Sequence, residues 1–173
     1  ASIRADEKKL QKWTALKTQT IDDFSMELAQ EIRYYQPFLM TARNMYAQVA
    51  LSAYAENWYA QSLERSLDHY DFTAIMAMPY MEQVEDKDQF FKDLVNRVSK
   101  YPNGLKKTVF EIQAVDWRNN NKVSSEEMAE TFKSLYQQGA LHVGYYPDNP
   151  FDNHPNPQIL KAVFDTKPSG LIP

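Results

Sequence analysis

The stretch Thr108-Val-Phe-Glu-Ile-Gln-Ala-Val-Asp-Trp117 begins apolar and ends in an acidic and an aromatic side chain. Three similar runs, at 38–46, 72–82 and 141–149, also end in polar and aromatic residues. The four runs start 33 to 36 residues apart, and patterns typical of helices lie between them. Strands that alternate with helices at this spacing predict repeated βα units on a parallel sheet.

The alternation within 108–117 bears on how this sheet is completed. A doubly wound sheet, covered by helices on both faces, should be near-continuous Val, Ile and Leu. Here Glu111 and Gln113 alternate with Phe110 and Ile112, so one face carries polar groups, as a barrel interior can near its mouth. Four βα units are half of a (β/α)8 barrel, which needs about 250 residues. We therefore expect an α/β fold that forms the C-terminal half of a (β/α)8 TIM-type barrel, with a small open sheet as the alternative.

The expected organisation is a single partial domain over 1–173, with a helical lead-in at 1–36 and four βα units at 37–173. The lead-in predicts two helices, at 4–19 with Trp13 in its core and at 20–35 with Thr20 as N-cap. The second should bury a stripe formed by Ile21, Phe24, Leu28 and Ile32. The later elements are expected as a loop at 48–57 and helices at about 57–69, 86–100, 124–138 and 157–165.

Composition excludes several classes of function. The net charge is −4 with no Lys/Arg cluster, which argues against a nucleic acid partner. No apolar stretch approaches the roughly 20 residues of a membrane span. The chain has no cysteine, and His69, His142 and His154 follow no metal-binding spacing, so neither a metal site nor a cofactor is expected. The absence of a glycine-rich phosphate loop argues against nucleotides.

Parallel α/β folds bind ligands at the carboxyl ends of their strands. Flat aromatic faces and side chains that donate and accept hydrogen bonds gather there, a composition that suits a sugar. The expected substrate-binding residues are Arg43, Asn44, Tyr46, Trp58, Tyr80, Glu82, Asp116, Trp117, Tyr146 and Asp148. No residue is assigned as catalytic, because sequence cannot place the two carboxyl groups that glycoside hydrolysis needs.

Each of these residues also has a structural interpretation. Trp117 could pack under its own loop, and Trp58 could belong to the core. Arg43 is expected to point inward, where it would hold a ligand carboxylate or form an ion pair with Glu111. A lone carboxylate such as Asp148 is by default a solvated surface group.

Four short motifs in fixed order resemble the C-terminal domain of the bacterial poly-β-1,6-N-acetyl-D-glucosamine N-deacetylases. They are Ala42-Arg-Asn-Met-Tyr46, Ala77-Met-Pro-Tyr80, Gln113-Ala-Val-Asp-Trp117 and Tyr145-Tyr-Pro-Asp-Asn149. The resemblance implies a two-domain periplasmic lipoprotein of the outer membrane that processes a biofilm exopolysaccharide. It also implies a metal-dependent deacetylase domain and a glycoside-hydrolase-like barrel that binds and cleaves partially deacetylated polymer.

By this resemblance the chain supplies strands five to eight of the barrel. The deacetylase motifs and the acidic catalytic segment of the fourth strand are expected outside these residues. The expected partners are therefore a glucosamine or N-acetylglucosamine oligosaccharide, the N-terminal half of the barrel and the deacetylase domain. Two rival functions remain open at this point, which are a complete small α/β hydrolase acting on sugars and a non-catalytic interaction module.

Overall fold

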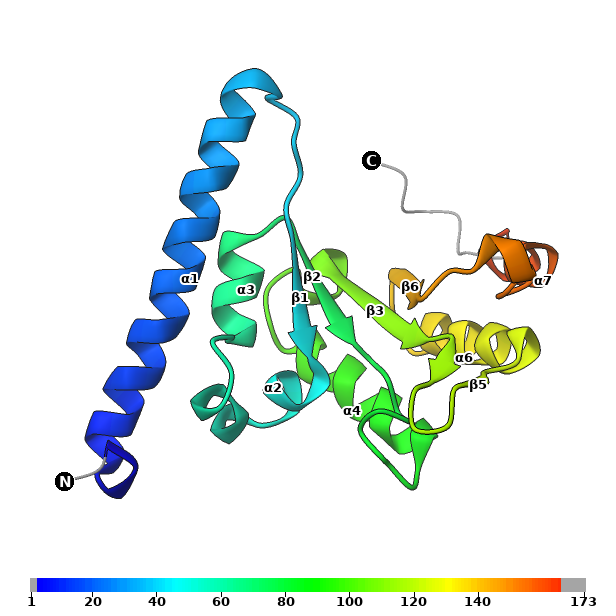
Figure 1. The fold of residues 1–173 in the computed structure, drawn as a ribbon, viewed down its shortest axis with the longest axis horizontal. Coiled ribbons are helices and arrows are strands. Elements are labelled where there is room, and N and C mark those ends of the chain that lie inside the picture. Colours follow the sequence, from blue (N-terminus) through cyan, green and yellow to red (C-terminus); the bar gives the residue numbers. More distant parts are fainter. Residues whose placement is uncertain (1–2, 166–173) are drawn as a thin grey trace.

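A computed structural model describes residues 3–165 and shows a four-stranded parallel sheet flanked by helices (Figure 1). The strands stand in the order β1-β2-β3-β6, which is also their order along the chain. They are β1 Ala42–Tyr46, β2 Phe72–Met76, β3 Thr108–Gln113 and β6 His142–Tyr146. This mixed α/β architecture confirms the predicted fold class, since consecutive parallel strands joined by helices are what part of a TIM-type barrel contains.

Seven α-helices and three short 3-10 helices are found in the described part of the chain. The α-helices are α1 Glu7–Tyr35, α2 Ala47–Leu51, α3 Leu63–His69, α4 Lys87–Ser99, α5 Gly104–Lys107, α6 Ser125–Gln137 and α7 Pro157–Phe164. The 3-10 helices are η1 Ile3–Ala5, η2 Ala53–Asn57 and η3 Pro150–Asp152. Ser124 caps α6, because its side chain accepts a hydrogen bond from the Glu127 backbone N–H at 3.1 Å.

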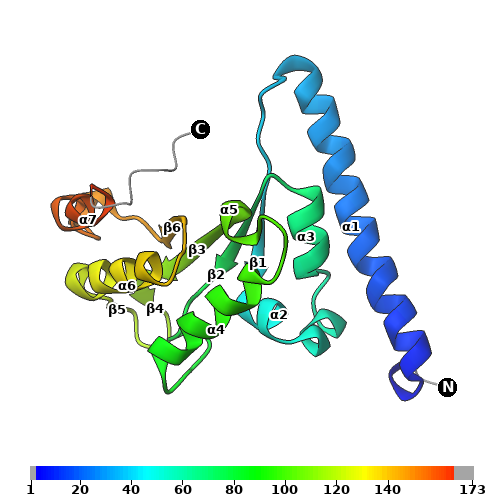
Figure 2. The ribbon, with the colours of Figure 1, turned by 180° about the vertical axis from the view of Figure 1, so that it is seen from behind.

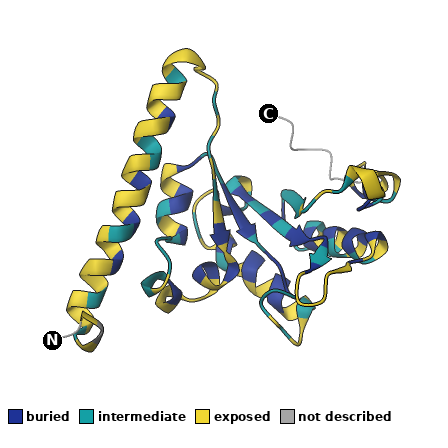
Figure 3. Ribbon diagram, viewed as in Figure 1, coloured by how far each residue is buried: buried dark blue, intermediate teal, exposed yellow. Residues whose placement is uncertain are grey.

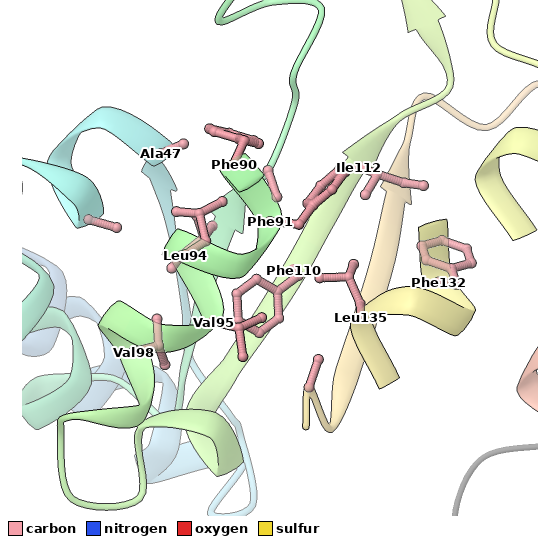
Figure 4. Packing of buried hydrophobic residues seen from close by; sticks show 14 of the residues in the cluster. Ala47, Phe90, Phe91, Leu94, Val95, Val98, Phe110, Ile112, Phe132 and Leu135 are labelled. Atoms are coloured by element: carbon pink, nitrogen blue, oxygen red, sulfur yellow. The ribbon is translucent and has the colours of Figure 1, made fainter. Parts of the chain in front are cut away.

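The strand register separates the side chains onto two faces. Met45, Ile75 and Phe110 are paired in register, are fully buried and lie on the face covered by helices, which we call the helix face. On the helix face, Phe110 and Ile112 of β3 point toward α4 and α6 (Figure 4). Figure 2 shows these helices from behind the sheet. Burying each such side chain contributes about 1.5–3 kcal/mol, so this layer is the main source of stability.

The opposite face, which we call the open face, is only partly covered in the described part of the chain. Asn44 and Tyr46 of β1 are exposed on it, and Glu111 and Gly144 are half-buried. Because neighbours in register point the same way, these residues lie on the side away from the helices. In a TIM-type barrel, the face of the strands that points away from the helices is the interior side of the wall.

The lead-in is one continuous helix of 29 residues, so the prediction of two helices was wrong. No Pro or Gly interrupts 7–35, and Thr20 donates its hydroxyl hydrogen to the carbonyl oxygen of Leu16, four residues back, instead of capping. Asp6 is the N-cap, with its side chain accepting from the Lys9 backbone N–H.

The helix α1 packs through a polar face, and its predicted buried stripe is exposed (Figure 3). Its buried residues are Thr14, Thr18, Asp22 and Ala29. Asp22 accepts hydrogen bonds from Arg65 at 2.8 Å and from the Tyr70 hydroxyl at 3.2 Å. The exposed residues, which we call the apolar stripe of α1, are Trp13, Ile21, Phe24, Leu28 and Ile32. The expected core position of Trp13 was therefore also wrong.

Three further segments differ from the predictions. The expected loop at 48–57 contains α2 and η2, and α3 starts at Leu63, later than expected. The run at 108–117 ends as a strand at Gln113 and continues into a small hairpin of β4 Val115–Asp116 and β5 Asn121–Lys122. Hydrogen bonds made by the side chains of Gln113 and Asp116 stabilise this change of direction. The pattern of apolar residues in the sequence does not predict such a turn.

We expect the 173-residue chain alone to associate in dilute solution, because β1 and β6 are open sheet edges and the apolar stripe of α1 is uncovered. Sedimentation velocity should show species larger than a monomer. The double variant Phe24→Glu, Leu28→Glu should reduce this association, whereas the control Gln19→Glu, Gln30→Glu adds the same charge at exposed positions outside the stripe. A monomeric wild-type chain that unfolds cooperatively would contradict this expectation.

Candidate functional site

Most of the predicted site residues lie where the parallel strands end. Tyr46 and Tyr146 are the last residues of β1 and β6, and Asp148 comes soon after β6. Tyr80 and Glu82 follow β2, and Asp116 and Trp117 follow β3. Arg43 and Asn44 lie within β1, and Trp58 follows η2. Parallel strands deliver these ends to one edge of the sheet, so the side chains gather along it.

An aromatic pair forms the clearest surface at this edge. The ring centroids of Trp117 and Tyr146 are 6.3 Å apart, with the rings tilted by 36°. Their side chains remain 41% and 57% exposed, so the pair is not buried under a loop. Trp117 stands in the turn between β4 and β5, and Tyr146 ends β6. Two adjacent exposed rings at the carboxyl edge of a sheet can pack on the apolar faces of a sugar.

A second group of aromatic residues follows β1. The rings of Tyr46 and Tyr59 lie 4.5 Å apart between centroids, tilted by 30°. Trp58, which comes after η2, is 60% exposed, so its core interpretation does not hold. The side chain of Gln61 binds the edge of β1, accepting from the Tyr46 N–H at 3.1 Å and donating to the Asn44 carbonyl at 3.0 Å.

Asp116 is engaged within its own hairpin. The Arg118 guanidinium donates to both of its carboxylate oxygens, at 2.8 and 2.7 Å, and Asn119 donates at 3.3 Å. The hydrogen bonds from Arg118 lower the pKa of Asp116 below its usual range. Asp116 is buried and paired, so its contacts fix the turn that carries Trp117.

Tyr80 is held by two charged residues on the helices. Its hydroxyl donates to Glu127 of α6 at 2.6 Å and accepts from Lys87 of α4 at 2.5 Å. Lys87 and Glu127 also form an ion pair at 2.8 Å. The Arg118 guanidinium lies 5.6 Å from the centre of the Tyr80 ring. Tyr80 thus links the segment after β2 to α4 and α6, and its ring also faces the hairpin that carries Trp117.

The segment 77–86 covers the end of β3 and carries Glu82. The buried amide of Gln113 accepts from the Met81 backbone N–H at 3.0 Å and donates to the Val115 carbonyl at 2.7 Å. Glu82 accepts a hydrogen bond from Gln48 at 2.7 Å. Burial raises the pKa of Glu82, against the opposing effect of the Gln48 bond. Glu82 is therefore a half-buried carboxyl group at the carboxyl edge of the sheet, and its one hydrogen-bond partner is neutral.

Arg43 points away from the open face, contrary to the expectation. It is paired in register with Thr73, whose hydroxyl contacts Ser66 of α3, and its guanidinium donates to the Ala60 carbonyl at 3.0 Å. The register places Glu111 on the other face, so the two cannot form the ion pair considered from the sequence. Arg43 holds the segment before α3 instead.

The last acidic residue of the set is exposed. Asp148 accepts one long hydrogen bond, at 3.4 Å, from the Tyr145 hydroxyl. The loop that carries it is closed by backbone bonds between Asn149 and His154, and the buried His154 ring contacts the Ala114 carbonyl at 2.9 Å.

Sequence reasoning missed the residues that position this edge. They are Gln48, Gln61, Lys87, Gln113 and Glu127. Gln113 is the one that the sequence marks, as an amide at the end of an otherwise apolar strand run. The partners of the other four are 7 to 47 residues away in the chain, so no local pattern reveals them.

Residues 3–165 contain no group of three or more His, Asp or Glu side chains placed to hold a metal ion. None of the helices in this range is both long and apolar enough to cross a membrane.

The ion pair of Glu127 gives a prediction about stability. Burial alone would raise the pKa of Glu127, but the bonds from Lys87 and Tyr80 outweigh it and lower that pKa. Its contribution is therefore present above the unfolded-state pKa of about 4.3 and is lost as the pH falls through the lower folded-state value. Glu127→Gln should lower the free energy of unfolding by roughly 1 kcal/mol or less at pH 7, given solvent screening.

Urea unfolding of wild type and variant at pH 7 and at about pH 3.5 measures this difference, which should narrow at the lower pH. Glu130→Gln is the matched control, because it breaks the exposed pair with Lys133 on the same helix. An equal difference at both pH values would show that the charge of Glu127 is not what stabilises the segment.

Comparisons with known proteins agree with this architecture. The family described as hypothetical glycosyl hydrolase family 13 matches residues 1–146. Two curated relatives, both named poly-beta-1,6-N-acetyl-D-glucosamine N-deacetylase, come from Escherichia coli strains K12 and O157:H7. Each is 34% identical to this chain over 172 residues, covering 96% of it. The chain spans about a quarter (26%) of the length of these relatives.

A solved structure is also similar, namely the PgaB (BpsB) glycoside hydrolase domain from Bordetella bronchiseptica. It shares 38% sequence identity with a TM-score of 0.86, over 98% of this chain and 47% of that one. These matches confirm the resemblance to the glycoside-hydrolase-like domain of the N-deacetylases. The chain belongs to hypothetical glycosyl hydrolase family 13.

Proposed function

We propose that this chain forms the substrate-binding wall of a barrel that binds partially deacetylated poly-β-1,6-N-acetyl-D-glucosamine. The single observation that carries the proposal is the exposed pair of Trp117 and Tyr146 at the carboxyl ends of the strands. Rings in this position bind the flat, apolar faces of pyranose units. The names of the similar proteins supply the identity of the polymer.

The remaining groups at this edge support a carbohydrate ligand. Tyr46, Tyr59 and Trp58 add aromatic surface at the β1 end. Asn44, Glu82 and Asp148 add donors and acceptors for hydroxyl and amino groups. Lys87, Arg118 and Lys122 are each paired with a carboxylate, and Arg43 donates to a backbone carbonyl, which favours a neutral or cationic sugar over an acidic one.

The proposal extends to the parent protein. This chain would pair with an N-terminal barrel half along β1, β6 and the apolar stripe of α1, and with a deacetylase domain. With that half present, the barrel would hydrolyse the polymer. The parent would be a periplasmic lipoprotein of the outer membrane that takes part in biofilm exopolysaccharide processing and export. The exposed stripe and the two open edges support a covering partner.

Trp117→Ala in the full-length gene product should weaken binding of β-1,6-linked oligosaccharides by roughly 1–3 kcal/mol, because an aromatic anchor is lost. Isothermal titration calorimetry gives the affinity, and circular dichroism should show an unchanged fold since Trp117 is largely exposed. The control is Tyr34→Ala, which removes an exposed ring near the opposite end of the sheet. Unchanged affinity in folded Trp117→Ala protein would assign Trp117 to packing alone.

We expect the purified 173-residue chain to release no acetate from the acetylated polymer and to cleave no partially deacetylated polymer. The resemblance places the deacetylase motifs and the acidic segment of the fourth strand outside these residues. Mass spectrometry of the oligosaccharides detects both reactions, with the full-length gene product as the positive control. Cleavage by the chain alone, abolished by Glu82→Gln or Asp148→Asn, would support a complete small hydrolase.

A further inference from the structure

Glu111 occupies the centre of the open face, one layer below the strand ends. Its register neighbours are Met76 on β2 and Gly144 on β6, and the next pair toward the carboxyl edge is Gln113 and Tyr146. In the layer below, Ala74 and Val109 lie in register with Asn44 of β1 and His142 of β6. The register therefore places Glu111 on the same face of the sheet as Tyr146, one layer further from the strand ends.

Gly144 leaves space beside this carboxyl group. A Cβ atom built at Gly144 would approach only one atom within 4 Å, a methyl carbon of Val109 at 3.5 Å. The backbone therefore tolerates a side chain there, and its absence keeps a gap between Glu111 and the neighbouring strand. Such a gap at the open face can admit a small group of a ligand.

Glu111 differs from the other acidic residues of this edge in having no partner. Within residues 3–165 it has neither a hydrogen bond nor a counter-charge, whereas Asp116 is bound by Arg118 and Glu82 by Gln48. Burial raises the pKa of the Glu111 carboxyl, and no other cause acts on it. The titratable groups on the same face of the sheet are Tyr46, His142 and Tyr146; neither Lys nor Arg is among them.

We propose that Glu111 is the specificity-determining residue that binds the ammonium group of a deacetylated glucosamine unit. The inference rests on the proposed function, in which the polymer carries free amino groups. An ammonium ion supplies the counter-charge that the protein does not, and a charge-assisted hydrogen bond stabilises the ionised carboxylate. An acetamido group is neutral and bulkier, so it supplies no counter-charge and fits the gap beside Gly144 less well. Glu111 thereby selects deacetylated units.

The test compares two β-1,6-linked oligomers of equal length, one of glucosamine and one of N-acetylglucosamine. Calorimetric titrations use the full-length gene product, and mass spectrometry checks that acetylation does not change during the measurement. Wild type should prefer the glucosamine oligomer. Glu111→Gln keeps the shape of the side chain and removes its charge, so it should weaken glucosamine binding about tenfold or more and leave N-acetylglucosamine binding unchanged. Glu126→Gln on the exposed start of α6 is the charge-matched control.

The pH dependence provides a readout that a structural role would not give. The ammonium ion binds ionised Glu111, so wild-type affinity for glucosamine should fall as the pH drops through the raised pKa of this carboxyl. Glu111→Gln should lack this change in affinity. Gly144→Ala is a second variant, which fills the gap with Glu111 in place and should also weaken glucosamine binding. If Glu111→Gln does not fold, weaker glucosamine binding by Gly144→Ala would support the role of Glu111, and unchanged binding would overturn it.

The possible outcomes separate this inference from the proposed function. Retained glucosamine preference in folded Glu111→Gln protein overturns the role of Glu111, and the proposed function stands if Trp117→Ala still weakens binding. Wild type that binds neither oligomer overturns the proposed function itself. Loss of preference in Glu111→Gln but not in Glu126→Gln supports the assignment.

Discussion

The register of β3 with its two neighbours is the constraint on which both the core and the site depend. It sets Phe110 beside Ile75 and Val143, and Glu111 beside Met76 and Gly144. Side chains alternate with a period of two, so a shift by one residue would move Glu111 into the helix layer and Phe110 onto the open face. The burial of Phe110 against α4 and α6 opposes that shift. The same hydrophobic contact that stabilises the sheet therefore determines where the carboxyl group of Glu111 points.

Neutral amide side chains make several of the hydrogen bonds at the carboxyl edge of the sheet. Gln113 joins the segment 77–86 to the end of β3, Gln61 binds the edge of β1, and Gln48 contacts Glu82. An amide can donate and accept at once, so it satisfies two backbone groups without adding charge. An Arg or Lys at these positions would have introduced positive charge beside the aromatic surface. Gln at these three positions adds no further cation to the edge.

The sequence was sufficient to predict the class of fold, because the strand runs and the helices at 86–100, 124–138 and 157–165 have clear periodicity. The prediction from sequence was wrong at α1, where apolar residues at helical spacing suggested a buried face. In the described structure the polar pairs of Asp22 with Arg65 and of Arg33 with Asp71 attach this helix. A hydrophobic stripe indicates that a surface will be covered, but not by which part of a protein. Arg43 was misplaced for a related reason, since parity along a five-residue strand cannot be assigned from sequence when both faces contain polar residues. The positions of the site residues at strand ends followed from topology, whereas their partners depended on contacts between distant segments.

Several acidic side chains at this edge have no cationic partner. Arg118 is paired with Asp116, Lys87 with Glu127, and Lys122 with Asp152. The acidic groups that have no cationic partner in the described structure are Glu82, Asp148 and Glu111. Two of them, Glu82 and Glu111, are half-buried, where screening by salt is weaker than at a fully exposed site. The uncompensated charge is thus negative and lies beside exposed aromatic rings. A ligand complementary to both features would present apolar ring faces and positive charge together, as the partially deacetylated polymer of the proposed function does.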